Sequence, residues 1–197
     1  GTISKWCRDI ILSSEQIERL AQKQKEASYK GRINFTEKLK KARLEEVEKL
    51  RKQGIKEIGK VNRRDLFMSG LSIYWSEGYN HSSNDQVGFV NSNPNMVLLM
   101  LRWFKEICGV TNERFSLSVR INQIHKKRVK EVEEYWSKIT GIPLSQFTKT
   151  TLIKAKTKRV YPNFNNHYGN LRVLVLKGTK LRRKINGWIE GLIEYGI

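Results

Sequence analysis

The 197-residue chain has few cysteines, few prolines, few acidic side chains and no long apolar run. Its two cysteines, Cys7 and Cys108, lie far apart and form no C-x-x-C pair. This excludes a disulfide scaffold and a cysteine zinc site, and it favours a reducing cytoplasm. Because no apolar run reaches the ~18–20 residues that span a bilayer and no leader is visible, we expect no membrane association. The first residue is Gly1 rather than Met, which suggests a piece of a longer protein.

Common catalytic motifs are also missing. The three histidines, His81, His125 and His167, are isolated along the chain, and no H-E-x-x-H occurs, which argues against a zinc site. The sequence contains no P-loop, no G-x-G-x-x-G and no G-x-S-x-G. The catalytic option that remains is a carboxylate that holds a divalent metal at the end of a helix or strand.

Positive charge is what the sequence has in excess. Its 38 Lys and Arg outnumber 19 Asp and Glu, which gives a formal charge of +19 and a pI near 10.1. The hydrophobic fraction of 39% and the aromatic fraction of 10% are too high for a disordered polybasic tail. We therefore expect a folded, strongly basic protein, and such a protein most often binds a polyanion.

The charge is concentrated at the two ends of the chain. Residues 1–64 and 146–197 each carry a net +9, whereas residues 65–145 carry +1. Eleven basic residues and no acidic one occur from Lys149 to Lys184. Ordinary solvated surfaces mix both signs, so this pattern favours nucleic-acid binding over a merely soluble basic surface. We accordingly expect a cytoplasmic, nucleoid-associated protein.

Capping patterns suggest helices in the first third of the chain and a domain boundary near residue 62. Residues 2–12 have the pattern of the end of a short helix. Ser13 and Gln16 form a capping-box pattern for a second helix, which we expect to end at Gly31. Asn34 and Glu37 predict the start of a third, lysine-rich helix. We assign residues 13–62 to a basic helical arm or linker.

The remaining residues, 63–197, have the pattern of an α+β domain. Helical spacing predicts helices over 65–77, 95–108 and 126–140 and a last helix from Thr179. Apolar alternation predicts strands over 86–91, 115–122, 147–154 and 170–177. The expected order of elements is therefore α-β-α-β-α-β-β-α, typical of an α+β fold.

The helix predicted at 65–77 has two features that bear on chemistry. Glu77 stands at its end, before Gly78, where a carboxylate opposes the helix dipole. Ser69, Ser72 and Ser76 form a row of small residues that would let a second helix approach closely. Two such helices would bring two Glu77 carboxylates together and could hold Mg²⁺. The alternative is a helix packed on its own domain, with Glu77 in solvent.

The segment Gly70–Gly78 resembles a divergent LAGLIDADG helix, the signature of a homing-endonuclease superfamily. In that superfamily the motif helices pack together at a dimer or pseudo-dimer interface, and the acid before the final glycine binds the catalytic metal. The resemblance thus implies a catalytic, Mg²⁺-binding role for Glu77 and a homodimer through the 65–77 helix. Trp75 stands where the family has its earlier aspartate, and the predicted order departs from the family's αββαββα core.

A second resemblance concerns the N-terminus. Residues 2–9, Thr-Ile-Ser-Lys-Trp-Cys-Arg-Asp, are similar to the end of the recognition helix in resolvase-type helix-turn-helix domains. This resemblance implies that residues 1–12 are the end of a helix-turn-helix whose first helices precede this chain. A pairing of such a domain with a LAGLIDADG-like domain is typical of some bacterial regulators.

The LAGLIDADG resemblance also implies that a sheet lies in the major groove of duplex DNA, and the strands carry suitable polar residues. Arg, Asn and Gln read purines bidentately, and Ser and Thr contact bases or phosphates. The residues predicted to contact DNA from the strands are Ser116, Ser118, Arg120, Asn122, Gln146, Thr148, Lys149, Thr150, Asn170 and Arg172. The residues predicted to position the DNA backbone are Lys154, Lys156, Lys158, Arg159, Lys180, Arg182, Arg183 and Lys184.

Three functions remain open from the sequence. One is a Mg²⁺-dependent DNA endonuclease that uses Glu77 as a dimer. Another is a non-catalytic DNA-binding regulator, which needs no cofactor. A third is an RNA-binding protein, because Tyr161, Phe164 and Tyr168 alternate with polar residues and could stack on unpaired bases.

Overall fold

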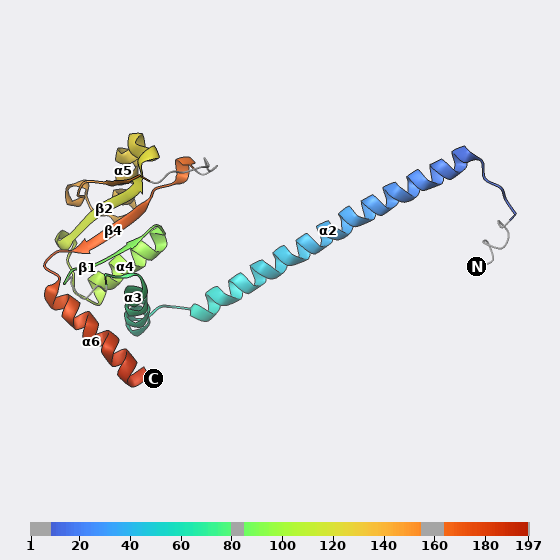
Figure 1. The fold of residues 1–197 in the computed structure, drawn as a ribbon. Coiled ribbons are helices and arrows are strands. Elements are labelled where there is room, and N and C mark those ends of the chain that lie inside the picture. The colour runs from blue at the N-terminus through green and yellow to red at the C-terminus, as the bar shows by residue number, and fades with distance from the viewer. Residues whose placement is uncertain (1–8, 80–84, 155–163, 197) are drawn as a thin grey trace. The chain divides into compact units, whose positions relative to one another are not determined.

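The computed structural model describes residues 9–79, 85–154 and 164–196 and divides the chain into two compact units, Gly1–Lys60 and Val61–Ile197 (Figure 1). We call them the N-terminal and the C-terminal unit. The described residues form five α-helices and a four-stranded mixed sheet, which confirms the predicted α+β class. Most of the segment compared with a helix-turn-helix, residues 1–8, and three predicted DNA contacts, Lys156, Lys158 and Arg159, lie outside the described residues.

The N-terminal unit contains one long helix, α2 (Ser14–Ile58). The predicted capping box is confirmed, because the Ser13 side chain accepts from the Gln16 amide and the Gln16 side chain accepts from the Ser13 amide. The predicted break at Gly31 and the new start at Asn34 are wrong, since the helix runs through both positions. A lone glycine costs a helix about 1 kcal/mol relative to alanine, which strong helix formers on either side offset.

The C-terminal unit begins with α3 (Arg63–Glu77), which ends where the predicted helix ends and starts two residues earlier than predicted. The Asn62 side chain accepts from the amides of Arg64 and Asp65, and Asp65 accepts in return from the Asn62 amide. The helix ends at Gly78, whose N–H donates to the carbonyl of Tyr74. These caps satisfy amides and a carbonyl that helix ends otherwise leave unpaired.

Three further helices complete the helical layer of the C-terminal unit. They are α4 (Pro94–Glu106), α5 (Val129–Thr140) and α6 (Thr179–Gly196). The N-cap of α4 is Asn93, whose side chain accepts from the Asn95 amide. Helix α5 starts three residues later than predicted, since the 3-10 segment Gln123–Arg128 precedes it.

The sheet contains β1 (Val87–Asn91), β2 (Phe115–Asn122), β3 (Thr151–Ile153) and β4 (Asn170–Val175) in the order β1-β4-β2-β3. Strand β4 pairs antiparallel with β1 and β2, and β3 pairs parallel with β2 (Figure 1). The strand predicted over 147–154 is correct for residues 151–153 alone, because Phe147 forms only an isolated bridge with Leu117 and residues 148–150 are not part of a strand.

One face of the sheet is covered by the helices. The predicted alternation in β2 is confirmed, because Phe115, Leu117, Val119 and Ile121 are buried. Leu117 pairs in register with Val173 of β4, and both belong to one core with Trp103, Trp136 and other residues from all four helices of this unit. The alternate residues of every strand therefore point to the opposite side of the sheet.

Gly70 is the position where α3 and α4 pack most closely. A Cβ atom there would lie 2.1–2.6 Å from atoms of the Trp103 indole, whose N–H donates to the carbonyl of Phe67. We expect Gly70→Ala to lower the free energy of unfolding of the C-terminal unit by about 2 kcal/mol through overpacking. In Gly31→Ala, whose Cβ meets nothing within 4 Å, helicity is expected to rise. Urea unfolding followed by circular dichroism measures both, and equal effects would contradict the close contact.

Candidate nucleic-acid interface

The side of the sheet that faces away from the core is polar and carries two arginines. We call it the open face. The strand register places Arg120 opposite Asn170 of β4 and opposite Thr151 of β3, and it places Ser118 opposite Arg172. Residues two apart along a strand share a side, so all of these side chains belong to one face. Its members are Val90, Ser116, Ser118, Arg120, Asn122, Thr151, Ile153, Asn170, Arg172 and Leu174.

The residues of the open face differ in exposure. Arg120, Thr151 and Asn170 are exposed and come from three different strands. Ser118 is 6% exposed, and the side chain of Asn122 accepts from the Ile124 amide at 3.0 Å. Arg120 is therefore the predicted β2 residue best placed to contact a ligand. Thr151 was not predicted, because its place beside Arg120 depends on the parallel pairing of β2 with β3.

Arg172 is held in place on the same face. Its guanidinium lies 5.6 Å from the ring centroid of Tyr79, and its Nη2 donates to Gln86 Oε1 at 3.5 Å. Its buried Nε has no hydrogen-bond partner among the described residues. A guanidinium whose plane is fixed by an aromatic ring loses little side-chain freedom when it binds a planar acceptor. No local pattern in the sequence indicates the contact of Arg172 with Tyr79, because Tyr79 lies outside the strands.

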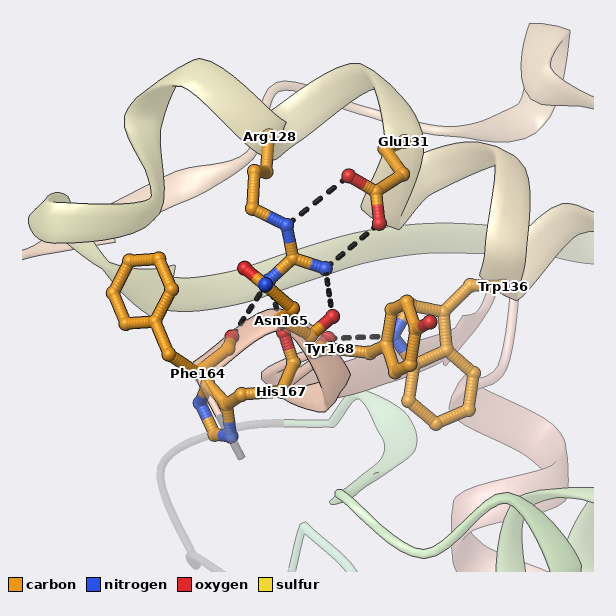
Figure 2. Close-up of polar contacts among 7 residues, drawn as sticks. All are labelled: Arg128, Glu131, Trp136, Phe164, Asn165, His167 and Tyr168. Atoms are coloured by element: carbon orange, nitrogen blue, oxygen red, sulfur yellow. Dashed lines mark hydrogen bonds and ion pairs between the residues drawn. The ribbon is translucent and has the colours of Figure 1, made fainter. Parts of the chain in front are cut away.

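Arg128 fixes the chain just before β4 (Figure 2). Its Nε and Nη2 donate to the two carboxylate oxygens of Glu131 at 3.0 and 2.7 Å. Its Nη1 donates to the carbonyls of Phe164 at 2.8 Å and His167 at 3.3 Å, and Nη2 also donates to the carbonyl of Asn165. We call this arrangement the Arg128 clamp. It uses all five guanidinium N–H groups, so Arg128 has a structural role.

Aromatic contacts support the Arg128 clamp. The Tyr168 ring stacks on Tyr135 with centroids 3.7 Å apart, and its carbonyl accepts from the Trp136 indole N–H at 2.8 Å (Figure 2). Gly169 follows with a φ of +64°, and a Cβ there would lie 2.5 Å from the carbonyl oxygen of Arg120. The clamp and this glycine set the start of β4 against β2, and thereby the position of Asn170 beside Arg120.

His125 is buried next to the clamp and is expected to make stability depend on pH. Its ring stacks on Phe164 at 4.2 Å between centroids, and its Nδ1 has no hydrogen-bond partner among the described residues. Burial, with smaller contributions from His167 and Arg128, lowers the pKa of His125 below its usual 6.5.

Because this pKa is lowered in the folded state, the unfolded chain binds the proton more readily. We expect stability to be full above the unfolded-state pKa of 6.5 and to decline as the pH falls below it, towards the lower folded pKa. In His125→Phe this decline should be smaller, as measured by thermal unfolding between pH 7.5 and 5.5. Parallel pH profiles for the two proteins would contradict the burial of a neutral imidazole.

Several other residues predicted to contact DNA form hydrogen bonds within the domain. Gln146 donates to the carbonyls of Asn112 and Phe115 at 2.8 and 2.7 Å. The Thr148 amide donates to the Leu117 carbonyl, and the Thr150 hydroxyl donates to Glu133. Lys149 and Lys154 are exposed near β3. Among these residues the two lysines are the ones whose polar atoms face solvent.

The basic cluster of α6 is divided between the core and the surface. Arg182 is 5% exposed and donates to the Tyr74 hydroxyl at 3.3 Å. Lys180, Arg183 and Lys184 are exposed; Arg183 lies 3.8 Å from Asp85, and the Lys184 ammonium lies 5.2 Å from the Trp188 ring centroid. Three of the four cations of this cluster are thus accessible to an anion.

Glu77 is exposed at the end of α3. Across the described residues, no three His, Cys, Asp or Glu side chains gather closely enough to hold a metal ion. One carboxylate offers two oxygen ligands, whereas Mg²⁺ takes about six, of which several are usually waters. A metal site at Glu77 would thus need ligands from elsewhere, such as a second copy of α3 or a DNA phosphate.

The small residues of α3 fall on two sides of the helix. Gly70 faces Trp103 inside the domain, so the close approach it allows is used there. Ser72 and Ser76 are exposed and Ser69 is half-buried, and each hydroxyl donates to a carbonyl of its own helix. The exposed serine row is open to a partner, and its role as a dimer interface stays a prediction.

Comparison with known protein families, with curated protein sequences and with solved structures finds no match for this chain. The LAGLIDADG and helix-turn-helix resemblances therefore rest on the residues quoted for them. Among the helices of the described ranges, none combines the length and the apolar character needed to cross a bilayer.

Proposed function

We propose that the protein binds duplex DNA through the open face of its sheet. The observation that carries the proposal is the register that brings Arg120, Thr151, Asn170 and Arg172, from three strands, onto one side. Guanidinium and amide groups can form bidentate hydrogen bonds to base edges in the major groove, and hydroxyls contact bases or phosphates. A major groove about 12 Å wide admits two neighbouring strands.

The charge of the chain supports a polyanionic partner for this face. The formal charge is +19, and exposed cations flank the sheet at Lys149 and Lys154 near β3. Lys180, Arg183 and Lys184 are exposed on α6, which also packs against β1. Such cations would contact phosphates and add affinity without sequence preference.

For the protein's role on DNA, we favour a non-catalytic regulator over an endonuclease. Glu77 is the one residue on which cleavage would depend, and within the described part of the chain it belongs to no group of three or more His, Cys, Asp or Glu side chains that could hold a metal ion. If cleavage occurs, two Glu77 side chains in a dimer through α3 would hold Mg²⁺. A cleavage assay with Mg²⁺ and with Glu77→Gln separates the two functions, because loss of cutting with retained binding assigns catalysis to Glu77.

Salt dependence of binding tests whether nucleic acid is the ligand. With about six phosphate contacts, log K for duplex DNA should fall against log salt concentration with a slope near −5. Fluorescence anisotropy at several salt concentrations measures this slope for duplex DNA, single-stranded DNA and single-stranded RNA. A slope near zero would refute the proposal. Tighter binding of single-stranded RNA than of the duplex would favour the RNA alternative.

A further inference from the structure

Helix α2 exposes large apolar side chains along its length. No residue of α2 is buried, and no other helix or strand occurs in the described part of this unit. Ile33, Leu44, Val47, Ile55 and Ile58 are between 40% and 74% exposed. In proteins, a helix gains most of its stability by packing an apolar face against another element. The exposed apolar side chains of α2 therefore indicate a surface that binds a partner.

Their spacing follows an eleven-residue repeat. One apolar position recurs at Ile33, Leu44 and Ile55, and the position three residues later is occupied by Thr36, Val47 and Ile58. We call these six residues the eleven-residue stripe. A repeat of eleven corresponds to ~3.67 residues per turn, which keeps the stripe on one side of the helix with a slight right-handed drift. The repeat depends on helical continuity through residues 31–36, which the structure provides.

Leu39 and Leu50 border the eleven-residue stripe. They are also eleven residues apart, and they are 54% and 56% exposed. Each lies three residues after a position of the stripe, Thr36 and Val47 respectively, and residues three apart are neighbours on a helix surface. The two leucines therefore widen the apolar side of α2.

Two cations lie within the eleven-residue stripe, and both can avoid burial. Arg51 is drawn towards Glu48, with Nε to Oε2 at 2.9 Å and Nη2 to Oε1 at 3.1 Å. Lys40 has a long aliphatic stem that can lie along an apolar surface while its ammonium stays in water. The stripe therefore does not require an unpaired charge to be buried.

We propose that the eleven-residue stripe binds the same stripe of a second copy of this chain. A partner must be a helix of matching length and period, and a second α2 supplies both. Each of the five large side chains offers on the order of 100 Å² of apolar surface, so a pair of helices would bury roughly 1,000 Å². The aliphatic parts of long side chains beside the stripe add to this buried area and bring it close to ~1,200 Å², the lower end for stable interfaces. This inference does not rest on DNA binding.

Analytical ultracentrifugation of the full chain tests the inference. We expect the wild type to be dimeric at about 100 µM, and Leu44→Glu with Ile55→Glu to raise the dissociation constant at least tenfold. The control, Phe35→Glu with Ala42→Glu, places two glutamates at exposed positions on the opposite side of the same helix and should remain dimeric. Glutamate is a good helix former, and circular dichroism checks that α2 persists in both variants.

Three results would overturn the inference. The wild type could be monomeric at this concentration, or the Phe35 and Ala42 variant could dissociate as readily as the stripe variant. The dimer could also survive the stripe substitutions and be lost in Ser72→Leu, which would place the interface on α3.

Discussion

Replacement of Arg128 by methionine is expected to lower the free energy of unfolding of the C-terminal unit by about 3 kcal/mol. The substitution keeps the aliphatic stem and removes a guanidinium whose side chain is 14% exposed. The Glu131 side chain is 56% exposed, so the ion pair by itself contributes less than about 1 kcal/mol. Here the carbonyls of Phe164, Asn165 and His167 would also lose a charged donor.

Arg102→Met is the matched control for this prediction. Arg102 also pairs with a glutamate, at 2.8 Å from Glu106, but both side chains are about half exposed. An exposed pair four residues apart on a helix contributes about 0.3–0.5 kcal/mol. Urea unfolding of both variants measures the difference. If Arg128→Met were no more destabilised than Arg102→Met, the Arg128 clamp would not determine how β4 is held.

The loss of both arginines from the open face is expected to weaken duplex binding by about 100-fold. A bidentate arginine contact to a base contributes about 1–3 kcal/mol, so Arg120→Ala with Arg172→Ala should lose roughly 3 kcal/mol or more. Arg120 is exposed, and Arg172 is held against Tyr79. Neither arginine forms an ion pair with an acidic side chain among the described residues, so the substitutions break no ion pair within the protein. Anisotropy titrations at fixed salt concentration measure the affinities.

The control for binding removes the same charge from the helical layer. Arg102 on α4 and Lys138 on α5 are exposed, and Arg102→Ala with Lys138→Ala lowers the net charge by the same two units. We expect this variant to bind within about threefold of the wild type, because distant charges are screened at physiological salt. Equal losses in the two variants would show that overall charge, and not the open face, determines affinity.

Local signals predicted much of the secondary structure. The cap at Ser13 and the alternation of β2 each depend on residues close in sequence, and the structure agrees with them. Gly31 was misinterpreted because a glycine marks a helix end when a left-handed residue follows the last turn, whereas here the backbone continues as helix.

The arrangement of the open face depends on contacts that are distant in sequence. The parallel pairing of β2 with β3 and the contact of Arg172 with Tyr79 join segments that local patterns cannot connect. The burial of Arg182 under Tyr74 was not predictable either, because a row of cations on a helix does not reveal which one turns inward. The predicted role of Glu77 stays a prediction, since it depends on ligands from a second molecule.

Site-specific crosslinking tests the central claim, that duplex DNA lies on the open face, most directly. A benzophenone side chain placed at Thr151, beside Arg120, should crosslink to a bound duplex on illumination. The same side chain at Lys138, exposed on the helical layer, should not. Crosslinking from position 138 and not from position 151 would contradict the account.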